Sequence, residues 1–202
     1  MVSLYHLKPQ FQNGLRPIVR QLARWGVSAN QVTLAAVGVS GATGLLIAWF
    51  AENDRLLLLL PAVLFVRMAL NAIDGMLARE HGMTTPLGAL LNELGDAVSD
   101  TALYLPLALV PGMPTVLIIL LVILALLTEL AGMCAVQIGA QRRYDGPMGK
   151  SDRALVLGTV ALLLGFGLQA GLWLTIVLII INGLLLITLV NRIRNALLEA
   201  NS

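Results

Sequence analysis

The sequence is poor in charged residues. Asp, Glu, Lys and Arg make up only 12% of its 202 residues, whereas soluble domains carry about 25%. Hydrophobic residues account for 58% of the chain, and its mean hydropathy is +0.86. A chain of this composition cannot cover its surface with polar groups, which excludes an ordinary soluble domain. We therefore expect an all-α integral membrane protein.

Three further scarcities limit the function. Cysteine occurs once, as Cys134, which excludes an intrachain disulfide framework. The net charge is only +2, so there is no reason to expect a nucleic-acid partner. Residues 1–30 are too polar to contain the apolar core of a signal peptide, so we expect none to be cleaved.

The long apolar runs predict a polytopic protein with six transmembrane helices. A span needs roughly 20 apolar residues, and a chain of this length holds one bundle of about six. We place the spans at residues 33–52, 56–78, 87–109, 115–140, 154–170 and 172–190. Residues 30–202 are therefore expected to form a single six-helix transmembrane domain.

The N-terminal segment is basic and amphipathic. Arg16, Arg20 and Arg24 recur every four residues and so share one face of a helix, with apolar residues elsewhere on it. We interpret residues 1–29 as a cytoplasmic juxtamembrane segment whose helix lies in the headgroup layer. The alternative is an ordinary basic flank of the first span.

The distribution of Lys and Arg predicts the orientation. With six spans, both termini and the loops at 79–86 and 141–153 lie on one side of the membrane. That side carries every Lys and Arg of the sequence except Arg55 and Arg67. By the positive-inside rule it faces the cytoplasm. We expect the protein to be embedded in a prokaryotic cytoplasmic (inner) membrane, in contact with its lipids.

Residues 71–100 concentrate polar side chains in this apolar chain. Burying such groups near hydrocarbon costs several kcal/mol each unless they bind something or one another. Asn71 and Asp74 follow Arg67 on one helix face, and Asn92 and Asp96 lie four residues apart on the next helix. Because a short loop joins the two helices, we expect these faces to be neighbours.

The facing side chains offer oxygen ligands suited to Mg²⁺ or Mn²⁺: Asn71, Asp74, Asn92 and Asp96. Gly75 and Gly88 permit close backbone approach, and Arg79 supplies a fork that matches phosphate. The pattern predicts metal-assisted transfer of a phosphorus-containing group at a membrane surface. The alternative is a set of interhelical hydrogen bonds and ion pairs, such as one between Arg67 and Asp74.

The same stretch resembles the signature of the CDP-alcohol phosphotransferases (CDP-alcohol phosphatidyltransferases), Asp-x2-Asp-Gly-x2-Ala-Arg-x8-Gly-x3-Asp-x3-Asp. The residues that match at the correct spacing are Asp74, Gly75, Ala78, Arg79, Gly88 and Asp96. The first and third aspartates of the signature are replaced by Asn71 and Asn92. The resemblance extends to the six-span plan with an amphipathic N-terminal helix.

This resemblance implies transfer of a phosphatidyl-type group from a CDP-linked lipid, usually CDP-diacylglycerol, to an alcohol, with release of CMP, in phospholipid biosynthesis. Members of the family are usually homodimers. The implied ligands of Mg²⁺ or Mn²⁺ are Asp74, Asp96, Asn71 and Asn92, with Asp96 also deprotonating the hydroxyl. The implied CDP contacts are Gly75, Ala78, Arg79 and Gly88, with Asn30 and Thr33 beside the nucleotide. The implied contacts to an acceptor or lipid phosphate are Lys150, Arg153, Arg142 and Arg143.

Several alternatives stay open. In the family four aspartates hold two cations, but two carboxylates balance only one, and Glu93 or Asp100 would have to supply more charge. Asn30 and Thr33 have a structural alternative as helix caps, and the basic loop residues have one as positive-inside charges. Glu129, inside the fourth span, is either functional or paired, for example with Arg67.

Two other functions compete with catalysis. A catalytically weakened relative would bind CDP-lipid in a regulatory or scaffolding role. An unrelated small transporter would use intramembrane charges as an ion relay, formed by Asp74, Asp96, Arg67 and Glu129.

Overall fold

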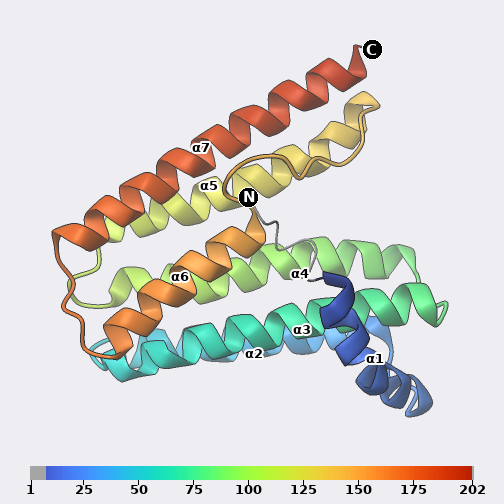
Figure 1. The fold of residues 1–202 in the computed structure, drawn as a ribbon, viewed down its shortest axis with the longest axis horizontal. Helices are drawn as coiled ribbons and strands as arrows, with labels where there is room; N and C mark the ends of the chain where they lie inside the picture. Colours follow the sequence, from blue (N-terminus) through green and yellow to red (C-terminus); the bar gives the residue numbers. More distant parts are fainter. Residues whose placement is uncertain (1–7, 202) are drawn as a thin grey trace. The chain divides into compact units, whose positions relative to one another are not determined.

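A computed structural model describes residues 8–201, and all regular structure in that range is helical (Figure 1), which confirms the predicted all-α class. Residues 1–7, the start of the predicted juxtamembrane segment, lie outside the described residues. The elements in chain order are α1 (Lys8–Arg24), α2 (Ala29–Trp49), η2 (Asp54–Leu58), α3 (Leu59–Glu80), α4 (Pro86–Tyr104), η3 (Leu105–Leu109), α5 (Thr115–Cys134), η4 (Ala135–Ile138), α6 (Lys150–Gly165) and α7 (Leu172–Ala200).

Within residues 8–201, four helical segments are long and apolar enough to cross a membrane. They are Ala29–Trp49, Asp54–Glu80, Thr115–Ile138 and Leu172–Ala200. The other two predicted spans coincide with α4 and α6, which have 19 and 16 residues. A 16-residue helix is about 24 Å long, somewhat less than the roughly 30 Å of a hydrocarbon core.

The loop predicted at 141–153 extends too far at its C-terminal end. Helix α6 begins at Lys150, so Lys150 and Arg153 are helical. The backbone N–H of Gly149 donates to Asp152 Oδ2 at 2.9 Å, and an acidic side chain in the first turn also favours the helix dipole. Helix α7 continues beyond residue 190, the predicted end of the last span, to Ala200.

Ser28 provides the cap of α2. Its hydroxyl accepts a hydrogen bond from the Gln31 N–H at 3.3 Å, and the Gln31 side chain accepts one from the Ser28 N–H at 2.8 Å. This reciprocal pair forms a capping box. Asn30 and Thr33 therefore lie inside the first turns of α2, and the capping role considered for them belongs to Ser28.

The helices divide into two compact units. The N-terminal unit contains the described residues up to Ala42 together with Val63–Ser99, and the C-terminal unit contains Thr43–Ala62 and the described residues from Asp100 onward. Helices α2, α3 and α4 each contribute residues to both units.

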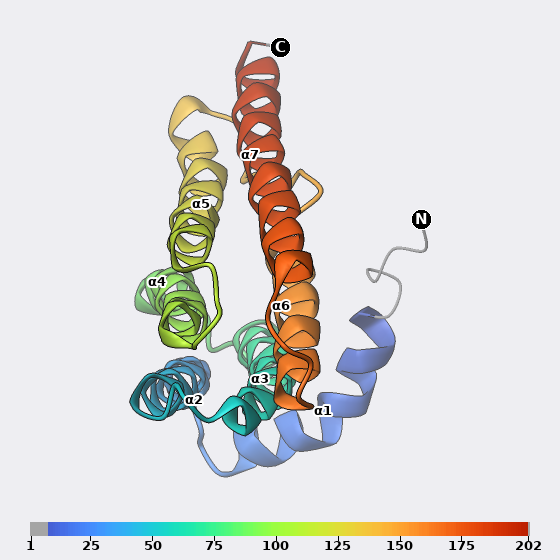
Figure 2. The ribbon, with the colours of Figure 1, turned by 90° about the vertical axis from the view of Figure 1, so that its left-hand side faces the viewer.

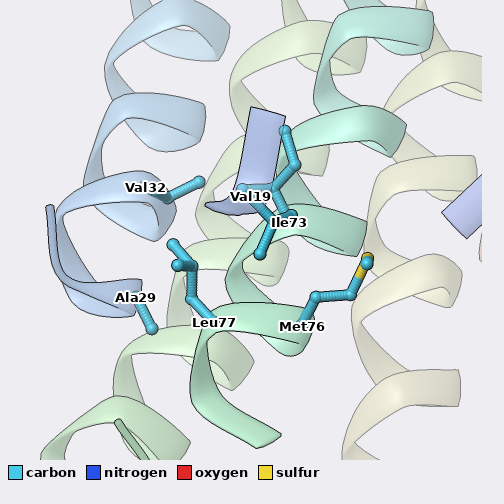
Figure 3. Close-up of a cluster of buried hydrophobic side chains, with 6 residues drawn as sticks. All are labelled: Val19, Ala29, Val32, Ile73, Met76 and Leu77. Carbon is cyan, nitrogen blue, oxygen red and sulfur yellow. The ribbon is translucent and has the colours of Figure 1, made fainter. Parts of the chain in front are cut away.

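The core of the N-terminal unit packs α1 against the turn of α3 that carries Asp74. Its buried side chains are Val19, Ala29, Val32, Ile73, Met76 and Leu77 (Figure 3). Because Ile73 and Met76 flank Asp74 in the sequence, this core fixes the direction in which the acidic side chain projects.

Helix α1 is amphipathic, as predicted, and the structure identifies what its apolar face contacts. Leu15, Val19 and Leu22 pack on the N-terminal core. The predicted basic face of Arg16, Arg20 and Arg24 is exposed, although Arg16 lies 3.5 Å from Glu80 Oε1. Much of the apolar face is therefore buried against the protein.

In the C-terminal unit, α5 and α7 pack along each other, as both Figure 1 and Figure 2 show. Leu121 and Leu124 of α5 and Leu178 and Leu185 of α7 are buried. Asn182 donates to the carbonyl oxygen of Leu117 at 3.1 Å, which joins the two helices by a polar contact.

Close packing within this unit requires a glycine at position 44. A Cβ atom at Gly44 would overlap the carbonyl oxygen of Ala102 and lie 2.8 Å from its carbonyl carbon. We predict that Gly44→Ala destabilises the protein by about 1–3 kcal/mol, because a backbone carbonyl cannot move aside cheaply. Thermal unfolding in detergent measures the effect. Gly41→Ala is the control, because nothing lies within 4 Å of its Cβ position; equal stability of the two variants would contradict the prediction.

Candidate functional site

The signature residues lie on α3 and α4 of the N-terminal unit, and the candidate residues Asn30 and Thr33 lie on α2. Helix α3 carries Asn71 and Asp74, α4 carries Asn92 and Asp96, and the start of α2 faces both helices. The predicted proximity of the α3 and α4 faces is confirmed by the contacts described next.

Thr33 connects α2 to the other two helices. Its hydroxyl donates to Asp74 Oδ2 at 2.8 Å, and both residues are buried. A Cβ atom at Gly95 would lie 3.3 Å from the Thr33 methyl group and 3.1 Å from Val37 Cγ2. The small residue at position 95 thus allows α4 to approach α2 where Thr33 holds Asp74.

Asp96 connects α4 to α3. Its Oδ1 atom accepts a hydrogen bond from Asn71 Nδ2 at 3.0 Å and lies 3.4 Å from Arg67 Nη2. The same Arg67 nitrogen donates to the backbone oxygen of Asp96 at 3.1 Å. Arg67 is only 4% exposed, whereas the Asp96 side chain is 28% exposed. Asp96 is a partner of Arg67 that the sequence alone did not identify.

The candidate nucleotide contacts belong to the same unit. A Cβ atom at Gly88 would lie 2.7 Å from Asn30 Oδ1, so the glycine permits a close approach between α2 and α4. A Cβ atom at Gly75 would lie 2.9 Å from Arg79 Nη2, which places the guanidinium beside that glycine. Ala78 is partly buried on the following turn of α3.

The donor set of this site matches one divalent cation better than two. Asp74 and Asp96 supply two negative charges, while Asn71 and Asn92 supply neutral carbonyl oxygens. Within residues 8–201, no group of three or more His, Cys, Asp and Glu side chains is arranged to hold a metal ion. One ion would therefore depend on the two carboxylates, the two amides and substrate oxygens.

A second polar cluster, the Glu129 network, lies in the C-terminal unit. Glu129 Oε1 lies 3.1 Å from Arg153 Nη2, and Glu129 Oε2 lies 3.4 Å from Arg192 Nη1. Arg153 also pairs with Asp100 Oδ2 at 2.9 Å. The side chains of Arg153 and Arg192 are 0% and 2% exposed, so both cations are buried, whereas their shared partner Glu129 is 20% exposed.

These pairs identify the partners of two acids that the sequence left open. Glu129 forms ion pairs with Arg153 and Arg192, whereas Arg67, the partner first suggested for it, pairs with Asp96. The carboxylate of Asp100, considered as an extra metal ligand, pairs with Arg153. Arg192 was not identified from the sequence, because an arginine near the end of the last span is typical of an ordinary flanking charge.

The loop before α6 is also held by ion pairs. Arg143 donates to both oxygens of Asp145 at 2.7 and 2.8 Å, and to Glu199 Oε2 at 2.7 Å. The hydrogen bonds from Arg143 hold the pKa of Asp145 below its usual range and raise the pKa of Arg143 itself. Arg142 lies 4.0 Å from Glu129 and stacks over the ring of Tyr144. Both loop arginines therefore already contact carboxylates.

Comparison with known proteins identifies the family. Residues 27–181 match the CDP-alcohol phosphatidyltransferases, so the chain belongs to this family and the resemblance seen in the sequence is confirmed. Inner membrane protein YnbA of Escherichia coli (strain K12) is 48% identical over 197 residues, which cover 98% of each chain. An archaetidylinositol phosphate synthase of Aeropyrum pernix is 26% identical over 167 residues, covering 82% of this chain and 83% of its own.

Solved structures have the same fold. The phosphatidylinositol phosphate synthase (PgsA1) of Mycobacterium tuberculosis, in complex with manganese and citrate, has a TM-score of 0.76 at 22% identity. The match covers 90% of this chain and 88% of that one. The same enzyme with CDP-DAG bound also has a TM-score of 0.76, at 21% identity, with coverage of 89% and 92%.

The Glu129 network should be important for stability. We predict that Glu129→Gln lowers the free energy of unfolding by about 3 kcal/mol, because two buried arginines lose a counter-charge. Thermal or denaturant unfolding of the purified protein measures the loss. Glu52→Gln, in an exposed position, is the matched control. A Glu129→Gln protein as stable as the control would show that the network is not structural.

The loop should loosen when Asp145 loses its charge. The clamp is the ion pair between Arg143 and Asp145. Because the folded protein lowers the pKa of Asp145, this pair contributes its full stability above the ordinary aspartate pKa. The contribution is lost as the pH falls through the lower pKa of the folded state, below about 4. We predict that Asp145→Asn reproduces this loss at neutral pH. The readout is several-fold faster hydrogen exchange at the Arg143 N–H, which bonds to Gly132 O at 3.1 Å. Exchange no faster than in Asp54→Asn would contradict the clamp.

Proposed function

We propose that this protein transfers a phosphatidyl-type group from CDP-diacylglycerol to an alcohol and releases CMP, as a step of phospholipid biosynthesis. The observation that carries the proposal is the pair of contacts that hold the two signature aspartates, Thr33 of α2 to Asp74 of α3 and Asn71 of α3 to Asp96 of α4. Family membership supports it, since the family transfers phosphatidyl groups from CDP-diacylglycerol to alcohols. A fold-related enzyme has been solved with CDP-DAG bound.

In this proposal the CDP group lies against the small residues of the site. Gly75 and Gly88 let the Arg79 and Asn30 side chains lie close to the helix backbone, with Ala78 on the next turn of α3. Arg79 offers its guanidinium to phosphate oxygens. Asn30 and Thr33 complete this nucleotide side of the site from α2.

A Mg²⁺ or Mn²⁺ ion would be held by carboxylate and amide oxygens from Asp74, Asp96, Asn71 and Asn92. When bound, such an ion acts as a Lewis acid on the pyrophosphate. A fold-related enzyme has been solved with manganese, which supports the assignment.

Asp96 is our candidate for the general base. Its partly exposed carboxylate accepts the proton of the acceptor hydroxyl, whose oxygen forms a bond to the phosphorus of the phosphatidyl group. The bond from that phosphorus to the oxygen of CMP breaks, and CMP leaves with the electron pair. Hydrogen bonds from Arg67 and Asn71 orient Asp96 for this role.

The remaining elements of the proposal follow the family plan. The protein has six transmembrane helices with α4 and α6 as its shorter spans, residues 1–29 as a juxtamembrane segment, and residues 30–202 as the phosphotransferase domain. Both termini and the active site face the cytoplasm in a prokaryotic inner membrane, and the protein forms a homodimer. Our candidates for contacts with the acceptor or a lipid phosphate are Lys150, Arg153, Arg142 and Arg143.

One observation favours a second function. Asn71 directs its NH₂ group, which cannot bind a metal, toward Asp96 Oδ1. A site closed by its own hydrogen bonds suits a catalytically weakened member that binds CDP-lipid in a regulatory or scaffolding role.

The test is CMP release from CDP-diacylglycerol by purified protein with Mn²⁺ or Mg²⁺ and a panel of alcohols. We expect turnover, and a loss of at least about 10²-fold in Asp96→Asn, because a general base contributes that much or more. Asp54→Asn, which changes an exposed acid, should retain activity. No release with any alcohol, together with intact CDP-lipid binding, would favour the weakened member. Binding of CDP-lipid that is lost in Asp74→Ala would exclude the ion-relay transporter.

A further inference from the structure

Arg67 is a buried cation at the expected metal site. It is 4% exposed and lies one turn of α3 before Asn71. Its Nη2 atom lies 3.4 Å from Asp96 Oδ1, which is the carboxylate oxygen that Asn71 also contacts. To bind a second divalent ion, the site would need more negative charge, but Arg67 adds a fixed positive charge.

The backbone contact of Arg67 keeps this charge in place. The same Nη2 atom donates to the carbonyl oxygen of Asp96 at 3.1 Å. This hydrogen bond involves α4 itself and not the carboxylate, so an ion that binds Asp96 does not release the arginine. A full positive charge within several ångströms of a divalent cation raises that cation's free energy substantially even at an effective dielectric constant of about 20.

The neutral residues at positions 71 and 92 agree with this cation. Four carboxylates would balance two divalent ions, whereas Asp74 and Asp96 balance one, and Arg67 reduces the local negative charge further. Asp100, the next acid along α4, pairs with Arg153. Arg67 and the two amides therefore all make the site less negative.

We infer that Arg67 takes the electrostatic place of a second metal ion, so that this protein binds a single divalent cation and uses Arg67 as the positioning residue of Asp96. The inference rests on the proposed function only in taking Asp74 and Asp96 as metal ligands. The arginine and the amides form a matched set, so restoring the aspartates alone creates only a weak site for a second ion.

The experiment counts Mn²⁺ ions bound to purified protein by electron paramagnetic resonance and calorimetry, without substrate. Wild type should bind one ion. The Asn71→Asp, Asn92→Asp double variant should bind its second ion weakly. Adding Arg67→Met to that background should tighten the second ion by at least about tenfold, because the nearby charge is removed. Spin coupling between two adjacent Mn²⁺ ions should appear only in the triple variant.

Two further variants separate charge from folding. Arg67→Lys keeps the cation and should behave like the arginine in both backgrounds, even if the fork geometry is lost. Arg20→Met removes an exposed arginine of α1 and should leave the second-ion affinity of the Asn71→Asp, Asn92→Asp background unchanged. Thermal unfolding of each protein establishes that it is folded before metal is counted.

The outcomes are decisive and independent of turnover. Two ions in wild type, no ion in wild type, or equal second-ion affinity with and without Arg67 would each overturn the inference. The predicted order of affinities supports it whether or not CMP is released. A protein that binds one ion as predicted but has no activity would contradict the proposed catalysis and leave the role of Arg67 intact.

Discussion

The cost of an unpaired charge away from water governs how this chain packs. Arg67, Arg153 and Arg192 are 4%, 0% and 2% exposed, and each lies against a carboxylate of another helix. Apolar side chains pack in many registers, but a buried arginine has few positions in which its fork meets an acid. The ion pairs therefore select the helix arrangement within each unit, Arg67 in the N-terminal unit and the Glu129 network in the C-terminal unit.

Within the N-terminal unit, the polar contacts between helices depend on small residues. Gly88 and Gly95 let α4 approach α2 closely enough for Asn30 and Thr33 to reach the site. The Thr33 hydroxyl then holds Asp74 from one side, while the apolar core beneath α3 fixes the turn from the other. These contacts orient the polar side chains of the unit before any ligand is bound, and such preorganisation lowers the cost of ordering side chains on binding.

Much of the fold followed from the sequence because apolar runs and four-residue spacing are local properties. They located the helices, the faces of α3 and α4, and the basic face of α1. The start of α6 was misplaced because capping depends on single contacts, such as Gly149 with Asp152. The partners of charged groups were also missed. Periodicity states which face an arginine occupies but not which acid on another helix it meets, so Asp96 for Arg67 and Arg192 for Glu129 required the structure.

Asn71 shows why residue type alone does not determine a site. As an oxygen donor it reads as a weaker metal ligand than aspartate, yet the structure uses its NH₂ group to bind Asp96. An aspartate in its place would set two carboxylates against each other, and such a pair is stable only when cations lie between them. The amide, with Arg67, lets the helices close without that requirement. The contact between α3 and α4 at Asn71 and Asp96 therefore does not require a cation between the two side chains.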